Sequence, residues 1–394
     1  AKVPRNDAPS DAFREDVLKS LSKIEGVYVP SFYDVEYNDD GSIKNFLPKY
    51  PDAPARIKRR IVENLDAAYY PAQWMVPYVQ IIHDRAAVEV MRGCPHSCAF
   101  CLAKVFYHKP RIRSKEKVLE IIEEITKNSG YEEISLFSLS TSDYPYLSDV
   151  VASVSKKFEE QAIGISLPSL RPKAYLGDVT QYLAKVRKST LTFAPEAGSD
   201  RLRDFIHKDF DLEELYAAVL KAYQNGWQSV KLYFMLGLPS ETDEDLDGII
   251  EIAKKVSSLR KEAAGFPAEV TLSISFFIPK PHTGFQREPM AVAYSLFKKR
   301  EYLRSRAKSL PRRIKLNFHN LETCLLEAAF SRGDRNLGKV LLFAYQSGCL
   351  LDSWPEHFNF QKWKDAFEKN NILLSFYARE RSPEEILPWQ HIIM

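Results

Sequence analysis

Strand-like and helix-like segments alternate through the middle of this chain. Six short apolar runs predict strands at 87–91, 133–139, 163–167, 190–194, 229–235 and 270–277. Between them, apolar residues recur every three to four positions, which predicts helices at 114–130, 147–158, 180–186 and 211–226 and another that starts at 242. This alternation is typical of α/β proteins with a parallel sheet. We therefore expect an α/β fold built on a partial (β/α)6 TIM-like barrel.

Capping residues mark the ends of the expected helices. Ser114 precedes an apolar face of the first helix, and Gly130 is placed to end it. Asp211 opens a later helix in the same way. Thr242 and Asp245, three residues apart, predict a capping box.

Three parts are expected along the chain. Residues 1–85 are Pro-rich and irregular and predict an extension packed on the barrel. The core barrel is expected at 86–285, and a mostly helical accessory region at 286–394. In such folds ligands bind at the carboxyl ends of the strands. Motifs that directly follow a strand are therefore the first candidates for a functional site.

The composition indicates a reduced, cytoplasmic enzyme. The chain has 55 Lys and Arg against 52 Asp and Glu, and a net charge of +3 is too small to imply a nucleic-acid partner by itself. No apolar stretch is long enough to span a membrane, and the first residues lack the apolar region of a signal peptide. Five cysteines in 394 residues are typical of a reduced chain without disulfides.

Three of those cysteines, Cys94, Cys98 and Cys101, lie within eight residues in a C-x3-C-x2-C pattern. Thiolates are soft ligands that select iron-sulfur clusters or zinc over hard cations. Three of them can hold three corners of a four-iron cluster, which leaves one iron open for a small molecule. The spacing therefore predicts an incomplete metal site with a catalytic use.

Other interpretations of the cysteines remain open. A structural zinc ion would need a fourth ligand, which His96 or His108 could supply, although the usual paired C-x2-C halves are missing. The chain would then be a noncatalytic zinc- or RNA-binding module. A disulfide and buried unreactive thiols are the remaining alternatives.

The run from Arg92 to Cys101 resembles the signature loop of radical S-adenosylmethionine (radical SAM) enzymes, with Phe100 at the aromatic position before the last cysteine. The resemblance implies a [4Fe-4S] cluster whose open iron is chelated by S-adenosylmethionine. It also implies reductive cleavage to methionine and a 5'-deoxyadenosyl radical, with the electron supplied by a flavodoxin- or ferredoxin-like donor. The cofactor carries the chemistry, and the protein binds and orients it.

Polar residues follow the second expected strand, where radical SAM enzymes bind the amino group of S-adenosylmethionine. Ser140, Thr141, Ser142 and Asp143 stand in place of the usual Gly-Gly-Glu. The resemblance implies cofactor contacts from Ser140, Ser142 and Asp143. A solvated turn is the alternative, because Ser, Thr and Asp are common turn residues.

Further contacts are expected after the third and fourth strands. Ser169 and Arg171 follow the third, and a guanidinium there can pair with the carboxylate of S-adenosylmethionine. A structural salt bridge is the alternative for Arg171. Glu196 lies in a segment, 194–201, that resembles the Glu-Ser-Gly-Ser segment of methylthiotransferase-like proteins, and it could accept hydrogen bonds from the ribose or the amino group. In the same segment Gly198 would allow a close backbone approach.

Motifs spread along the chain resemble one largely uncharacterised radical SAM family, at 26–37, 83–85, 191–198, 231–235, 279–282 and 333–335. Full-length members carry a cobalamin-binding-like domain ahead of the barrel. The 93 residues before Cys94 do not hold such a domain, so we expect either a fragment of a longer protein or a member that lost it. Cobalamin would then be used only through a domain absent from this chain.

The resemblance also suggests methyl or methylthio transfer to RNA or a ribosomal protein. A strongly basic helix is expected at 294–309. Eight Lys and Arg residues in this helix and directly after it could form an RNA-facing surface. They are Lys299, Arg300, Arg304, Arg306, Lys308, Arg312, Arg313 and Lys315. An ordinary solvated surface is the alternative. The sequence does not distinguish RNA, protein and small metabolites as substrates.

Overall fold

Parallel strands form the centre of the part of the molecule that the structure describes. The structure is a computed structural model that describes residues 11–394 except 80, 83, 108, 162 and 173–190. One sheet has the order β4 (Ala86–Glu89), β7 (Glu133–Phe137), β8 (Gly164–Ser166). The other has the order β12 (Ile314–Phe318), β11 (Glu269–Phe276), β10 (Ser229–Leu236), β9 (Leu191–Glu196). Neighbours in each sheet pair in parallel and follow chain order, which confirms the α/β fold class. In the described residues no ladder joins β8 to β9.

Helices connect the strands. They are α3 (Lys115–Ser129), α4 (Leu147–Lys157), α6 (Asp200–Phe205), α7 (Leu212–Gln224), α8 (Asp243–Ala264) and α9 (Ala293–Ala307). The Ser114 hydroxyl accepts a hydrogen bond from the Lys117 N–H, and Gly130 ends α3 in the left-handed conformation with φ 70°. The Asp211 carboxylate caps α7, and Thr242 forms the capping box of α8 with Asp245. These predicted caps are confirmed; the helix expected at 180–186 lies outside the described residues.

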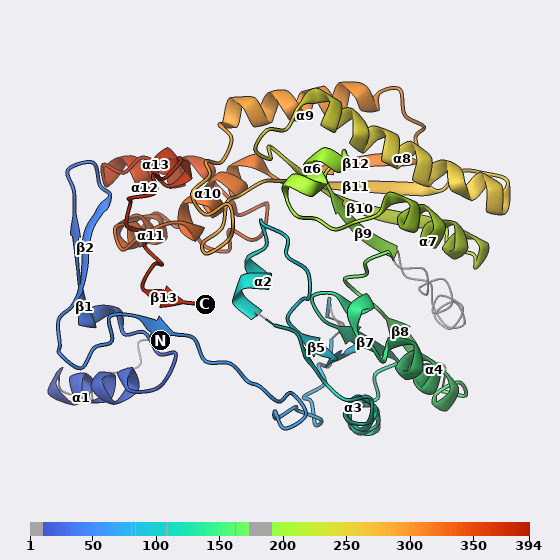
Figure 1. The fold of residues 1–394 in the computed structure, drawn as a ribbon, viewed down its shortest axis with the longest axis horizontal. Coiled ribbons are helices and arrows are strands. Elements are labelled where there is room, and N and C mark those ends of the chain that lie inside the picture. The colour runs from blue at the N-terminus through green and yellow to red at the C-terminus, as the bar shows by residue number, and fades with distance from the viewer. Residues whose placement is uncertain (1–10, 80, 83, 108, 162, 173–190) are drawn as a thin grey trace.

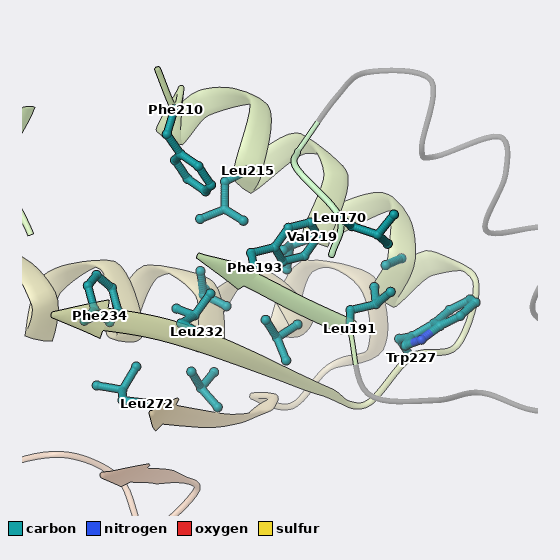
Figure 2. Close-up of a cluster of buried hydrophobic side chains, with 14 of the residues drawn as sticks. Leu170, Leu191, Phe193, Phe210, Leu215, Val219, Trp227, Leu232, Phe234 and Leu272 are labelled. Atoms are coloured by element: carbon teal, nitrogen blue, oxygen red, sulfur yellow. The ribbon is translucent and has the colours of Figure 1, made fainter. Parts of the chain in front are cut away.

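The apolar core fills the space between the strands and their helices. Figure 2 shows Phe193, Leu232 and Phe234 from β9 and β10 near Leu215 and Val219 of α7. Leu232 and Phe234 are fully buried. Each such side chain stabilises the fold by about 1.5–3 kcal/mol. This core fixes the positions of the strand ends from which the site is built.

Strand β12 was not predicted. It pairs with β11 over five residues, so the second sheet extends into the region expected to be accessory. Ile314, Leu316 and Phe318 alternate with Lys315 and Asn317, which is a strand period. Lys315 was assigned to an expected basic surface, so the alternation was missed.

The first and last parts of the chain lie together. A hairpin of β1 (Tyr33–Tyr37) and β2 (Ile43–Pro48) follows α1 (Asp11–Ser22) and the short helix η1 (Pro30–Phe32), and β3 (Ile57–Lys58) pairs in parallel with β13 (Ile392–Ile393) near the C-terminus. Four helices form most of the remaining C-terminal region (Figure 1). They are α10 (Leu321–Ser331), α11 (Leu337–Gln346), α12 (Phe360–Lys369) and α13 (Leu374–Ala378). Among the described helices, none combines the length and apolar character that a membrane crossing requires.

An arginine anchors the irregular extension to the barrel. Arg113 is almost completely buried, and its guanidinium donates to the Leu65 carbonyl at 2.6 Å and the Glu89 carbonyl at 3.1 Å. The Ser114 N–H donates to the Asp66 carboxylate. These contacts hold residues 65 and 66 against the start of α3, next to the strand that leads to the cysteines.

Candidate functional site

The three cysteines lie on a loop that is closed at its base. β5 (Met91–Arg92) precedes the loop and pairs antiparallel with β6 (Arg111–Ile112), which follows it. Helix α2 (Leu102–Tyr107) begins directly after Cys101. This pairing was not predicted, because two-residue strands carry no periodic signal.

Two backbone hydrogen bonds and an apolar cluster fix the tip of the loop. The Ala99 N–H donates to the Ile206 carbonyl, and the Gly284 N–H donates to the Ala99 carbonyl, both at 2.9 Å. Phe100 packs against an apolar cluster that includes Phe277 and Phe285 beyond the strand ends. The loop therefore spans to the carboxyl ends of β9 and β11. The proposed contact of Phe100 with a cofactor stays a prediction.

All three cysteines are free and half-buried. The Cys101 N–H donates to the Cys98 carbonyl, and Cys101 Sγ accepts from the Lys104 N–H at 3.4 Å. Burial raises the pKa of the Cys94 and Cys98 thiols. None of the five cysteines forms a disulfide, which argues against that interpretation.

The donor set fits a [4Fe-4S] cluster. Three thiolates on one loop can each ligate a separate iron. A structural zinc ion would need a fourth ligand from the protein. His96, a proposed zinc ligand, instead pairs with Asp143, with Nε2 2.8 Å from Oδ2, and His108 lies outside the described residues.

The polar residues after β7 are buried and face the cysteine loop. Ser140, Thr141 and Ser142 are each at most 2 % exposed, so the segment is not a solvated turn. Asp143, in the short helix η2 (Thr141–Asp143), accepts a hydrogen bond from the Ser140 hydroxyl and contacts His96 of the loop. The segment thus joins the end of β7 to the cysteine loop.

The segment after β8 lies beside the segment after β7. Ser169 has a left-handed backbone with φ 59°, and its carbonyl accepts from the Thr141 N–H. Such a conformation is costly outside glycine and concentrates at functional sites. The Arg171 N–H donates to the Ser142 hydroxyl at 2.8 Å, and Arg171 Nη2 lies 3.6 Å from Cys98 Sγ. Its other terminal nitrogen donates to the Asp209 carbonyl, so these contacts are not the structural salt bridge considered as an alternative.

A carboxylate and an ammonium meet at the end of β9. Glu196 has a left-handed backbone with φ 71°, and Oε1 lies 3.5 Å from Lys208 Nζ. Burial raises the pKa of Glu196, although Lys208 and Arg171 favour its charged form. The same two cations oppose the effect of burial on the pKa of Cys98. Cys98, Arg171, Glu196 and Lys208 therefore share one site.

Lys208 was not among the predicted residues. It follows α6, and only the return of the chain after this helix brings it beside Glu196. Nothing local in the sequence marks it.

Gly198 was expected to allow a close backbone approach, and the approach is to helix α8: a Cβ there would lie 2.0 Å from the Asp245 carbonyl oxygen.

Comparisons with known proteins fit this geometry. The model of the radical SAM superfamily matches residues 88–253, which include the cysteine loop and the ends of β7, β8 and β9. An uncharacterized protein of Methanocaldococcus jannaschii is 31% identical over 337 residues, covering 86% of this chain and 71% of that protein. The chain belongs to the radical SAM superfamily. It is a radical SAM enzyme, and the superfamily implies a [4Fe-4S] cluster and S-adenosylmethionine.

Two further relatives have names that indicate a reaction. An uncharacterized methyltransferase of Pyrococcus horikoshii is 24% identical over 247 residues, covering 61% of this radical SAM chain and 50% of that protein. A tRNA-2-methylthio-N(6)-dimethylallyladenosine synthase of Carboxydothermus hydrogenoformans is 24% identical over 183 residues, covering 44% and 41%. The chain thus spans half or less of each of these relatives.

Proposed function

We propose that Cys94, Cys98 and Cys101 hold a [4Fe-4S] cluster and that S-adenosylmethionine binds beside it, against the ends of β7, β8 and β9. When bound, the cluster supplies the electron that cleaves S-adenosylmethionine to methionine and a 5'-deoxyadenosyl radical. The observation that carries the proposal is the meeting of Arg171, Glu196 and Lys208 at Cys98. A flavodoxin- or ferredoxin-like protein is the proposed electron donor.

The chain's own residues would bind and orient the cofactor. Arg171 carries a guanidinium next to Cys98, suited to a bidentate pair with a carboxylate. Glu196 offers a carboxylate to ribose hydroxyls or an ammonium, and Lys208 balances its charge within the buried site. Ser140, Ser142, Asp143 and Ser169 are further proposed cofactor contacts. Hydrogen bonds from Ser140 to Asp143, from Arg171 to Ser142 and from Thr141 to Ser169 support their placement together at the strand ends.

Anaerobic reconstitution tests the proposal. The full chain is expected to bind four irons and to form 5'-deoxyadenosine from S-adenosylmethionine with dithionite. Changing Cys94, Cys98 or Cys101 singly to Ala should abolish both. Cys324→Ala and Cys349→Ala are the matched controls, because these two buried thiols lie away from the loop in the sequence. Stoichiometric zinc without iron, or a cluster lost only in the control variants, would contradict the proposal.

The proposed reaction is methyl or methylthio transfer to RNA or a protein. The names of two relatives support group transfer of this kind. Cobalamin would take part only through a domain outside this chain. In the proposed division of the chain at residues 85 and 285, the reaction takes place in the middle part. Anaerobic reaction with S-adenosylmethionine labelled at its methyl group, followed by mass spectrometry of co-purified RNA and protein, identifies the product.

The basic helix α9 provides little free charge for RNA. Arg304 pairs with Glu301 at 2.9 Å, and Arg306 pairs with Asp247 at 2.7 Å. Lys299 pairs with the buried carboxylate of Glu241 at 3.0 Å. Arg300 also contacts Glu301, so four of the eight proposed RNA-facing cations have acidic partners. These pairs favour the alternative of an ordinary surface helix.

A further inference from the structure

Two basic stretches of the chain meet beside the cysteine loop. Residues 56–62 and 102–112 contain no Asp or Glu, and together they hold seven Lys and Arg residues. These seven residues form what we call the basic patch: Arg56, Lys58, Arg59, Arg60, Lys104, Lys109 and Arg111. The two stretches are far apart in the sequence, so only the fold brings their charges together.

Arginine side chains join the two stretches. Arg59 Nη1 donates to the Val105 carbonyl in α2 at 2.7 Å, and Arg111 Nη1 donates to the Val62 carbonyl at 3.0 Å. Strand β3, which contains Lys58, pairs with β13, and this pairing fixes the first stretch in place. Figure 1 shows β13 near α2. The two stretches therefore lie side by side.

Acidic side chains do not neutralise the basic patch. Among the described residues, none of its seven cations has a carboxylate within 4.0 Å. The members exposed to solvent are Arg56, Lys58, Arg60 and Lys109. Burial lowers the pKa of Arg59, and the positive charge of Arg111 acts in the same direction. On α9, by contrast, four cations have acidic partners. A surface of one sign without its own counter-charges attracts a partner of the opposite sign.

The basic patch begins next to the third cysteine. Helix α2 starts directly after Cys101, and the Lys104 N–H donates to Cys101 Sγ at 3.4 Å. None of the six residues of α2 is buried. A helix of six residues is about 9 Å long, so a partner on this surface would lie close to Cys101. The proposed cofactor contacts of Arg171 and Glu196 gather instead at Cys98.

Uncompensated charge beside a cluster ligand suits a redox partner. Electron-transfer proteins meet through small, short-lived interfaces, and opposite charges guide them together. RNA is also anionic, but an RNA substrate must reach the strand ends where the cofactor is proposed to bind. An electron needs to reach only the cluster at Cys101.

We propose that the basic patch docks an acidic protein that carries one electron to the cluster. The donor loses one electron and the cluster gains it, which is the electron that cleavage of S-adenosylmethionine requires. The proposal rests on the proposed function, because that function supplies the cluster and needs a donor. It adds the surface at which the donor docks and the sign of the donor's charge.

Turnover with two reductants tests the proposal on the full reconstituted chain. One reductant is reduced flavodoxin, a small acidic flavoprotein, and the other is dithionite, which needs no docking surface. We expect the triple variant Arg56→Glu, Arg60→Glu, Lys109→Glu to form 5'-deoxyadenosine about tenfold more slowly at limiting flavodoxin, because electrostatic steering is lost. Its rate with dithionite should be unchanged. Added salt should slow the flavodoxin-driven reaction more in the wild type than in the variant.

A second triple variant is the matched control. Lys261→Glu, Lys308→Glu and Arg312→Glu make the same change in net charge at three exposed positions. Lys261 is in the last turn of α8, and Lys308 and Arg312 precede β12. These residues therefore lie toward the amino ends of β11 and β12, whereas the cysteine loop contacts the segment beyond the carboxyl end of β11. Both rates should stay close to the wild-type values.

Surface plasmon resonance with immobilised flavodoxin tests docking without turnover. The wild type should bind about tenfold more tightly than the basic-patch variant, and the control variant should bind like the wild type. Unchanged binding in the basic-patch variant, or equal loss of turnover with both reductants, would overturn the proposal. Loss of binding to a labelled single-stranded oligoribonucleotide with an intact flavodoxin-driven rate would assign the surface to RNA and also overturn it. Flavodoxin binding to the basic patch without 5'-deoxyadenosine formation by either reductant would count against the proposed function alone.

Discussion

The backbone N–H of Arg171 donates to the side-chain hydroxyl of Ser142 across 2.8 Å. This bond joins the segment after β8 to the segment after β7, at the side of the site where Arg171 reaches Cys98. Because Ser142 is buried, water does not replace the bond when it is lost. The bond therefore helps to fix the backbone of the residue whose guanidinium reaches Cys98.

Replacing Ser142 by Ala should weaken both folding and cofactor binding. We expect the free energy of unfolding to fall by about 1–3 kcal/mol, because the Arg171 N–H is left unsatisfied. Urea denaturation of cluster-free protein measures this loss, and equilibrium dialysis after reconstitution measures S-adenosylmethionine affinity. Ser142→Thr keeps the hydroxyl and serves as the comparison. Wild-type stability in the Ala variant would contradict the role given to this bond.

Lys208 and Glu196 should behave as a coupled pair. Lys208→Met leaves the Glu196 carboxylate buried without its ammonium, which should cost about 3 kcal/mol of unfolding free energy. Adding Glu196→Gln should recover most of that loss, because the uncompensated charge is removed. Urea denaturation of the two single variants and the double variant gives the coupling energy. Additive losses would show that the two side chains act independently.

Local signals predicted the parts of the fold that depend on neighbouring residues. The cap at Ser114, the end of α3 at Gly130 and the capping box at Thr242 are all confirmed. Each rests on hydrogen bonds within a few residues. The apolar face of α3 is confirmed for the same reason, since a helix period fixes which residues share a side.

The parts of the fold and of the site that were not predicted depend on contacts between distant segments. Lys208 reaches Glu196 only after α6 reverses the chain, and β5 pairs with β6 across the whole cysteine loop. The sequence named Cys98 from the cysteine spacing, Arg171 from its place after an expected strand, and Glu196 from such a place and the resemblance of its segment. The structure brings these three together. The sequence could not show that Gly198 serves helix packing, because that contact depends on where α8 lies.

The contact between Gly198 and α8 should tolerate no side chain. A Cβ on Gly198 would lie 2.0 Å from the Asp245 carbonyl oxygen and 2.6 Å from the Ile249 nitrogen. Gly198→Ala is therefore expected to cost about 3 kcal/mol or more, since backbone atoms must move. Gly338→Ala is the control, because a Cβ at that position of α11 meets nothing within 4 Å and alanine favours a helix by about 1 kcal/mol. Thermal unfolding should show a large loss for the first variant and a small gain for the second.

His391 should make the stability of the chain depend on pH below neutrality. Burial lowers its pKa from 6.5 to about 4, and the charges of Arg335 and His282 act in the same direction. Between these two values the unfolded chain binds a proton that the folded chain does not, so stability is fully present above pH 6.5 and falls as the pH drops toward 4. The loss is at most about 3 kcal/mol, because one pKa unit corresponds to about 1.4 kcal/mol. Urea denaturation at several pH values should show this slope in the wild type and a shallower one in His391→Phe. Equal slopes in both proteins would mean that other groups produce the pH dependence.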